Sequence, residues 1–208
     1  MTTSTPEKAF SMIREFQLAD WITLANAVCG IGAIFSMMTY LQMPDVIHIY
    51  FASGLLFAAV VFDFLDGRVA WWRHKTSLLG RELDSLADVI SFGVAPAMIG
   101  YGCGLQGFYD RVILAYFVAC GVSRLARYNV TADTLSGGTD KVKYFEGTPI
   151  PTSLLLVLVI VLAAWSGAIH ENLWFGEITM WGFRLHPLVF MYAISGSLMI
   201  SRIRVPKP

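Results

Sequence analysis

Charged residues are scarce in this sequence. Only 14% of its 208 residues are Asp, Glu, Lys or Arg, whereas a soluble domain carries roughly 25% charge. Hydrophobic residues make up 56% of the chain, and its mean hydropathy is +0.60. This balance excludes an ordinary soluble domain and predicts that most side chains face lipid or lie buried between helices.

Cysteines are also few, and internal repeats are lacking. Cys29, Cys103 and Cys120 lie singly in apolar runs without metal-ligand spacing, which excludes a disulfide framework and leaves packing as their role. Residues 1–19 contain no apolar core and no cleavage site, so we expect no signal peptide. Without repeats or low-complexity tracts, we expect residues 1–208 to form a single domain.

Long apolar stretches, by contrast, are abundant. Six of them approach the ~20 residues that a membrane-spanning helix needs. Their predicted bounds are Trp21–Tyr40, Val46–Leu65, Ser85–Cys103, Val112–Leu125, Pro151–Ile169 and Pro187–Ile203. We therefore predict an all-α integral membrane protein, with six transmembrane helices forming a bundle over residues 20–205.

Residues 6–19 show a different pattern from the spans. Phe10, Ile13 and Phe16 recur at helical spacing, with charged residues between them. This pattern predicts an N-terminal amphipathic helix lying in the membrane interface. A helix that simply caps the bundle would give the same pattern, so both interpretations stay open.

Lys and Arg residues are unevenly distributed about these stretches. With the N-terminus inside, 13 of the 15 basic residues fall on one side, and only Arg111 and Arg184 fall on the other. Basic residues are concentrated on the cytoplasmic side of membrane proteins. We therefore expect both termini and the loops at 66–84 and 126–150 to face the cytoplasm.

Four aspartates lie within 26 residues at this cytoplasmic side. Asp63 and Asp66 are three residues apart, and Asp84 and Asp88 are four apart, so on helices each pair shares a face. An ionisable residue inside a membrane segment costs roughly 2.5–3.5 kcal/mol, so four of them require a partner. Oxygen-rich sites bind hard divalent cations, and the spacing predicts that the two pairs converge on such ions.

Two other interpretations of the acids stay open at this point. They could form an ion or proton pathway in a transporter, which would place them near the bilayer midplane and favour inverted repeats. They could also pair with neighbouring arginines, namely Arg68, Arg73 and Arg81. The cytoplasmic position of the acids and the interposed glycines favour a metal site.

The acidic stretch resembles the signature of the CDP-alcohol phosphotransferase family, D-x2-D-G-x2-A-R-x8-G-x3-D-x3-D. The matching positions are Asp63, Asp66, Gly67, Ala70, Gly80, Asp84 and Asp88. The spacing agrees throughout, and one position departs, because Trp71 stands where the family has Arg. Arg73 and Lys75 are close enough in sequence to supply that charge, and Trp71 also fits an interfacial aromatic belt.

Further stretches resemble the phosphatidylserine synthase branch of the family. They lie at 80–97, 123–130 and 144–151, and the resemblance as a whole covers roughly residues 18–165. It implies an enzyme that transfers the phosphatidyl group of CDP-diacylglycerol to L-serine and releases CMP. An enzyme of the same fold that uses glycerol 3-phosphate, inositol or inositol phosphate remains an alternative.

The resemblance also implies roles for individual residues. Asp63, Asp66, Asp84 and Asp88 would bind two divalent cations per active site, Mg²⁺ or Mn²⁺, and Asp88 would act as the general base. Nucleotide binding would involve Asp63, Gly67, Ala70, Gly80 and Arg73. Serine binding would involve Ser91, Arg124 and Arg127.

The two arginines of the acceptor site also have a physical rationale. Arg124 and Arg127 are three residues apart and share a helical face, and a guanidinium binds a carboxylate through two hydrogen bonds. Their alternative role is anchoring at lipid headgroups. Asn129 and Glu146 are weaker candidates for polar contacts with substrate. We interpret Asp20, Thr23 and Asn26 mainly as caps of the first helix, with contact to the nucleotide as the alternative.

Expected partners are CDP-diacylglycerol, L-serine and membrane lipids, and no nucleic acid. The resemblance implies a homodimer, for which small residues in the third and fourth spans permit close helix packing. We expect an integral membrane location with the active site facing the cytoplasm. The membrane would be that of the endoplasmic reticulum in a eukaryote and the cytoplasmic membrane in a prokaryote.

Overall fold

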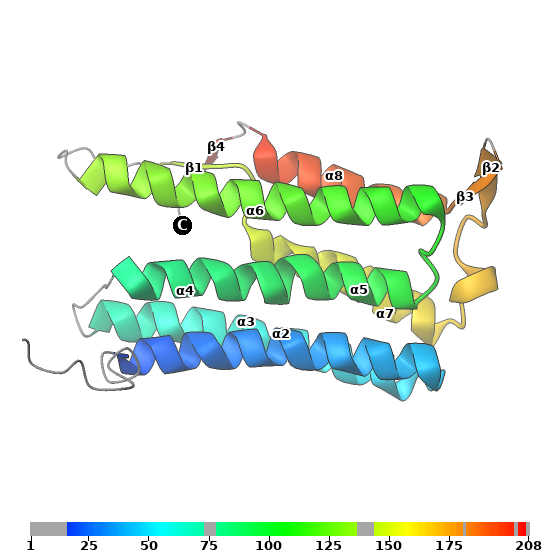
Figure 1. Ribbon diagram of the computed structural model, residues 1–208, viewed down its shortest axis with the longest axis horizontal. Coiled ribbons are helices and arrows are strands. Elements are labelled where there is room, and N and C mark those ends of the chain that lie inside the picture. The colour runs from blue at the N-terminus through cyan, green and yellow to red at the C-terminus, as the bar shows by residue number, and fades with distance from the viewer. Residues whose placement is uncertain (1–15, 73–77, 137–143, 181, 202–203, 207–208) are drawn as a thin grey trace, which may run out of the picture.

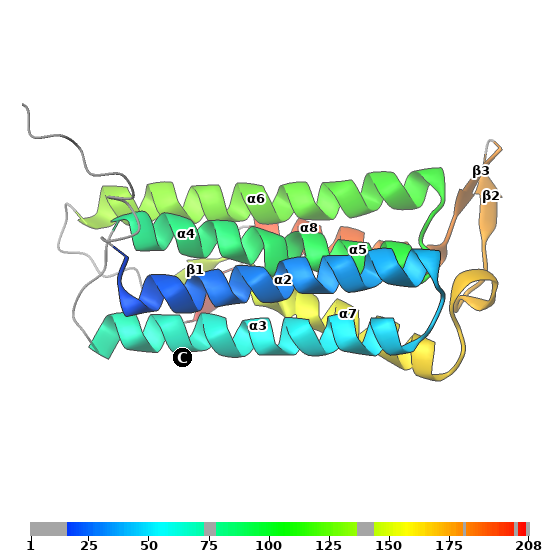
Figure 2. The ribbon, with the colours of Figure 1, turned by 60° about the horizontal axis from the view of Figure 1, so that its bottom comes forward.

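A computed structural model describes residues 16–72, 78–136, 144–180, 182–201 and 204–206. In this structure long helices run side by side along one axis; one pair of short strands lies at an end of the bundle and the other lies beside the helices (Figures 1 and 2). The first two long helices of the chain pack chiefly on each other, and so do α6 (Phe108–Ser136) and α8 (Phe190–Ile200). The third span lies between these two pairs.

The first two predicted spans are confirmed as α2 (Leu18–Gln42) and α3 (Ile47–Trp72). Asp45 Oδ1 accepts a hydrogen bond from Ile47 N at 3.0 Å and so caps the start of α3. The end of α3 lies seven residues beyond the predicted Leu65. The first aspartate pair therefore lies inside this helix, in its last turns, rather than in a loop.

The third span is one continuous helical segment made of α4 (Leu78–Asp88), the π-helical turn η1 (Val89–Val94) and α5 (Ala95–Gly102). It begins seven residues before the predicted Ser85, so the second aspartate pair is also helical. Pro96 has no N–H for the carbonyl one turn before it, and a π-helical turn is one way in which a helix accommodates such a break.

The remaining helices are α6 (Phe108–Ser136), α7 (Leu154–Trp165) and α8 (Phe190–Ile200), the last two preceded by 3-10 turns η2 (Ile150–Ser153) and η4 (Pro187–Val189). The fourth predicted span was too short, because α6 continues through polar residues at both ends and has 29 residues. The fifth was too long, because α7 ends at Trp165 and a short 3-10 turn, η3 (His170–Asn172), follows.

Two short antiparallel ribbons were not predicted. Strand β1 (Tyr144–Glu146) pairs with β4 (Arg204–Pro206), and β2 (Ile178–Met180) pairs with β3 (Phe183–Leu185). After β1, Gly147 has φ +75°, and a Cβ there would lie 2.3 Å from Met199 O. Only glycine fits this turn, which holds the start of η2 against the end of α8.

Three helical segments are long and apolar enough to cross a membrane: Leu18–Gln42, Ile47–Val69 and Leu79–Gly102. The apolar helices at Ile150–Trp165 and Pro187–Ile200 are shorter. Large apolar side chains such as those of Phe35, Phe51 and Trp165 are exposed on the outside of the bundle. The helices are therefore those of an integral membrane protein.

The predicted interfacial helix at 6–19 lies outside the described residues except for its last four, of which Leu18 and Ala19 begin α2.

The start of α2, the end of α3, the start of α4 and the end of α6 lie at one end of the bundle (Figures 1 and 2). This arrangement brings both aspartate pairs and the two arginines of α6 toward the same end. We call it the acidic end.

Candidate functional site

The two aspartate pairs converge at the acidic end, as their spacing predicts. Carboxylate oxygens of Asp63, Asp66 and Asp84 all lie within 4.8 Å of one another. The fourth acid, Asp88, is one helical turn beyond Asp84 and is close enough to Asp63 for their charges to interact. Asp66 and Asp88 are buried, whereas Asp63 and Asp84 are partly exposed. The cluster is therefore reachable from outside through its less buried members.

Helix α2 supports this cluster with two side chains on one face. Thr23 Oγ1 donates a hydrogen bond to Asp66 Oδ2 at 2.6 Å. Asn26 Nδ2 donates to Asp88 Oδ1 at 3.4 Å. Since Thr23 and Asn26 are three residues apart, one helical face reaches an acid of α3 and an acid of α4.

The interpretation of these residues as helix caps needs correction. Asp20 is a cap, since its Oδ2 accepts a hydrogen bond from Gln17 N at 2.7 Å. Thr23 and Asn26 instead contact the acids, and both are buried. Their shared face was visible in the sequence, but no pattern in α2 alone indicates which acids it meets.

Close approach of α2 to η1 fixes this part of the site. A Cβ at Gly30 would lie 2.8 Å from Ser91 Cα, so glycine is required where the two backbones meet. Ser91 is fully buried, and its Oγ donates to the Asn26 carbonyl oxygen at 2.9 Å. The predicted acceptor-site residue Ser91 is thus engaged with the backbone of α2.

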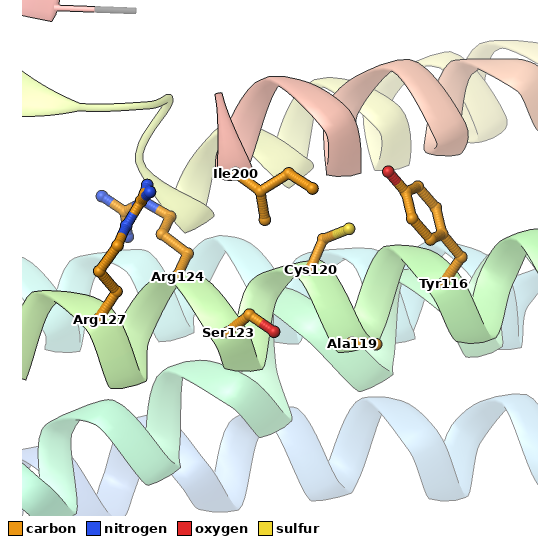
Figure 3. A pocket seen from close by; sticks show the side chains of 7 residues that line it. All are labelled: Tyr116, Ala119, Cys120, Ser123, Arg124, Arg127 and Ile200. Carbon is orange, nitrogen blue, oxygen red and sulfur yellow. The ribbon is translucent and has the colours of Figure 1, made fainter. Parts of the chain in front are cut away.

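A pocket of about 410 Å³ lies between α6 and the end of α8. Figure 3 shows the guanidinium groups of Arg124 and Arg127 together at one end of it, with Cys120, Ile200 and Tyr116 farther along. The Tyr116 hydroxyl and Ser197 Oγ lie 3.0 Å apart, which joins α6 to α8. The pocket therefore has a basic end and a largely apolar remainder, and the predicted arginine pair shares one face as expected.

Arg124 connects this pocket to the acids. It is close enough to Asp88 for their opposite charges to interact. Its Nε is buried and has no hydrogen-bond partner among the described residues. Since buried polar atoms are nearly always paired in folded proteins, this donor is available for a bound anion.

The sequence comparisons agree with this geometry. The family model described as CDP-alcohol phosphatidyltransferase matches residues 16–194. The chain belongs to this family. The match includes α2, all four acids and both arginines of the pocket.

Several curated members of the CDP-alcohol phosphatidyltransferase family are similar to the chain. A CDP-diacylglycerol–serine O-phosphatidyltransferase of Saccharomyces cerevisiae is 43% identical, over 99% of this chain and 76% of that protein. Proteins with the same name are 34% identical in Helicobacter pylori, over 88% and 69% of the two chains, and 32% identical in Bacillus subtilis, over 67% and 72%. An archaetidylserine synthase of Methanothermobacter thermautotrophicus is 34% identical over 70% of this chain and 60% of that protein.

The donor set of the CDP-alcohol phosphatidyltransferase site fits a divalent cation. Three carboxylates offer oxygens to one small volume, and hard divalent cations bind such ligands. In addition, Asp84 Oδ1 is buried and lacks a hydrogen-bond partner in the described part of the chain. Four acids without a cation between them would repel one another, so the residues present suit metal binding.

Some predicted site residues lie beside the cluster, and others lie outside the described part. A Cβ at Gly67 would meet nothing within 4 Å, so the space beside this exposed residue is open. Gly80 lies in the first turn of α4 and is partly exposed. The predicted nucleotide contact Arg73, together with the side chains of Ala70, Trp71 and Glu146, lies outside the described residues.

Asn129 lies in a polar contact between α6 and α4. Its Nδ2 is 3.0 Å from Ser85 Oγ and 3.3 Å from Glu82 Oε2. The sequence suggested Asn129 as a weak candidate for substrate contact but did not indicate Glu82 or Ser85. The contact holds α6, which carries the two arginines, against α4, which carries the second aspartate pair.

Proposed function

We propose that this chain transfers the phosphatidyl group of CDP-diacylglycerol to L-serine, giving phosphatidylserine and CMP. The observation that carries the proposal is the cluster of four acids beside a pocket with two arginines at one end. Acids that bind cations suit a pyrophosphate, and arginines suit the carboxylate of an amino acid. The names of the similar family members support serine as the acceptor.

The proposed reaction is a substitution at phosphorus. The serine hydroxyl oxygen forms a bond to the phosphorus that bears diacylglycerol. The bond from that phosphorus to the bridging oxygen of the pyrophosphate breaks, and CMP leaves with the electron pair. Asp88 takes the hydroxyl proton as the general base. Its position one turn beyond Asp84, within reach of Arg124, supports this assignment.

We propose that Asp63, Asp66 and Asp84 hold the divalent cations, with Asp88 contributing to the second ion. Bound Mg²⁺ or Mn²⁺ would neutralise charge on the pyrophosphate and stabilise the attacking and leaving oxygens. The close approach of three carboxylates supports cation binding here. Both cations accept oxygen ligands, so this donor set suits either.

Arg124 and Arg127 would bind the serine carboxylate at the basic end of the pocket. A pair of guanidinium groups fixes a carboxylate in position and orientation, which would point the hydroxyl of the same molecule toward Asp88. The unpartnered Nε of Arg124 and the interaction of Arg124 with Asp88 support this placement. Ser91 would contribute to the same site indirectly. Its Oγ donates a hydrogen bond to the backbone carbonyl of Asn26, and the Asn26 side chain contacts Asp88.

The nucleotide would lie beside Gly67 and Gly80, next to Asp63. Residues without side chains let a ligand approach the backbone, and the open space at Gly67 supports this position. Ala70 and Arg73 would complete the nucleotide site. Arg73 would then supply the positive charge that the family signature places at position 71.

We further propose that residues 1–208 form one domain with six membrane-crossing helices and an interfacial helix at 6–19. The acidic end would face the cytoplasm, where serine and the cytidine headgroup are dissolved. The concentration of basic residues in the sequence segments predicted to lie on that side supports this orientation. A homodimer in the membrane completes the proposal.

The direct test is CMP release by the purified protein with CDP-diacylglycerol and Mg²⁺ or Mn²⁺. Serine, glycerol 3-phosphate and inositol are offered separately, with and without a chelator. We expect release with serine alone, abolished by chelation. Release with another acceptor would keep the chemistry and replace the acceptor, whereas no release with any of them, in wild type and in Trp71→Arg, would refute the proposal.

A further inference from the structure

Asn26 occupies a buried contact between α2, α4 and η1. Its side chain is 0% exposed, and its Nδ2 donates to Asp88 Oδ1. Its backbone carbonyl accepts the hydrogen bond of Ser91 Oγ, and Gly30, one turn along α2, allows η1 to approach. The backbone of Asn26 is therefore held by η1, while its side chain reaches the carboxylate of Asp88.

The amide oxygen of Asn26 argues against a purely structural role. Oδ1 is buried and has no hydrogen-bond partner among the residues that the structure describes. An unsatisfied buried oxygen destabilises a fold. Leucine, which is apolar and of similar size, would remove this oxygen and also the hydrogen bond to Asp88, so its two effects on stability largely cancel. Stability alone therefore does not explain an asparagine at this position.

We propose that Asn26 is a positioning residue for Asp88 in the transfer reaction. The amide engages one oxygen of the Asp88 carboxylate, so the rotation of that carboxylate is fixed. The second oxygen is then held in one direction, available to take the proton of the acceptor hydroxyl. This inference rests on the proposed function, because it presupposes Asp88 as the general base.

The test uses two substitutions of the full-length protein, Asn26→Leu and Asn26→Asp. Both keep the approximate volume of the side chain, and both remove the N–H group that donates to Asp88. Steady-state CMP release gives kcat and the KM for serine, and thermal unfolding gives Tm. Substitution of a residue that orients a metal ligand by a hydrogen bond typically lowers activity by roughly 10–100-fold. We therefore expect kcat to fall by about that factor in both variants.

The KM for serine should stay near its wild-type value, because the arginine pocket is untouched. The Tm of Asn26→Leu should stay close to that of the wild type, because removal of the unsatisfied oxygen offsets the loss of the hydrogen bond to Asp88. Loss of rate without loss of stability is a combination that a structural role does not produce.

Ser36→Ala is the matched control on the same helix. Ser36 is buried and donates to His48 O at 2.9 Å, far along α2 from the acids. We expect this variant to lose stability and keep its kcat. A wild-type kcat in either Asn26 variant would overturn the proposal, and so would a fall in kcat that comes with a fall in Tm like that of Ser36→Ala. Absence of serine-dependent CMP release in the wild type would count against the proposed function instead.

Discussion

Both ends of the bundle bury charged and polar side chains, but the two ends differ in how these side chains are hydrogen-bonded. At the end opposite the acids, Asp110 is fully buried and accepts hydrogen bonds from Gly107 N and His186 N, at 2.8 and 2.9 Å, and from the His186 ring. Tyr40 and His170 are likewise paired there, 2.8 Å apart. Each of these groups has its partner within the chain.

At the acidic end, buried polar atoms of Asn26, Asp84 and Arg124 have no hydrogen-bond partner among the described residues. The carboxylates there lie close to one another, even though Thr23 and Asn26 donate hydrogen bonds to Asp66 and Asp88. A cluster of buried polar groups that are all hydrogen-bonded within the protein holds helices together, and we call the Asp110 cluster closed in this sense. A cluster with unpaired buried atoms, such as that of the four acids, has an energetic cost that a bound ligand can remove, and we call it open. The difference favours the acidic end as the end that binds substrate, without reference to any relative.

The largest effect should follow from removing one acid of the open cluster. Asp84→Asn keeps the shape of the side chain but loses a charge from the cation site. Because metal stabilisation of the transition state is worth several kcal/mol, we expect CMP release to fall roughly 1,000-fold. Thermal unfolding of the cation-free protein should show no loss of stability, since carboxylate repulsion decreases. A rate near that of the wild type would remove Asp84 from the site.

Removing the acid of the closed cluster should lower the stability of the fold and leave the activity of the folded protein unchanged. Asp110→Ala leaves two backbone N–H groups and a buried histidine without their acceptor, so we expect a destabilisation of about 3–5 kcal/mol. The folded fraction should keep its specific activity. Denaturant unfolding combined with CMP release per folded molecule measures both. A loss of activity that exceeds the loss of folded protein would contradict the distinction between the two ends.

Cation binding gives a smaller effect on stability. Mg²⁺ or Mn²⁺ at 100 times its dissociation constant should stabilise the folded state by about 2.7 kcal/mol. A chelator should reverse this shift in Tm. The shift should be much reduced in Asp84→Asn and retained in Ser36→Ala, which is remote from the acids. Equal shifts in the two variants would show that the cation binds elsewhere.

Removing an arginine of the pocket should affect the acceptor selectively. A hydrogen bond to a charged group contributes about 1.5–3 kcal/mol, so Arg124→Ala should raise the KM for serine by roughly 10–100-fold. The KM for CDP-diacylglycerol should change much less. Arg111→Ala, an exposed arginine at the opposite end, is the matched control and should leave both constants unchanged. An equal rise in both constants for Arg124→Ala would place Arg124 outside the acceptor site.

The smallest effect is expected at the position where the chain departs from its family signature. Trp71→Arg restores the family residue beside the open cluster. Exposed charge pairs contribute about 0–1 kcal/mol, so we expect CMP release to rise by no more than roughly fivefold. A much larger rise would show that Arg73 does not supply the missing charge.

Much of this organisation could be predicted from residue spacing. Intervals of three and four residues placed Asp63 with Asp66, and Asp84 with Asp88, on shared helical faces, and the structure confirms that three of these acids converge. The helix ends were harder to predict, because polar residues continue α3 and α6 past their apolar stretches. The short ribbons were missed, since pairing of β1 with β4 joins segments about 60 residues apart.

The sequence by itself determined the helical membrane fold, the acidic signature and the family, because apolar length and local spacing are written along the chain. Only the tertiary structure decided that Thr23 and Asn26 serve the acids rather than the helix start, and that Arg124 lies beside Asp88. These contacts depend on how α2, η1 and α6 pack against one another. Packing is a long-range property, and no helix encodes alone which neighbour its polar face will meet.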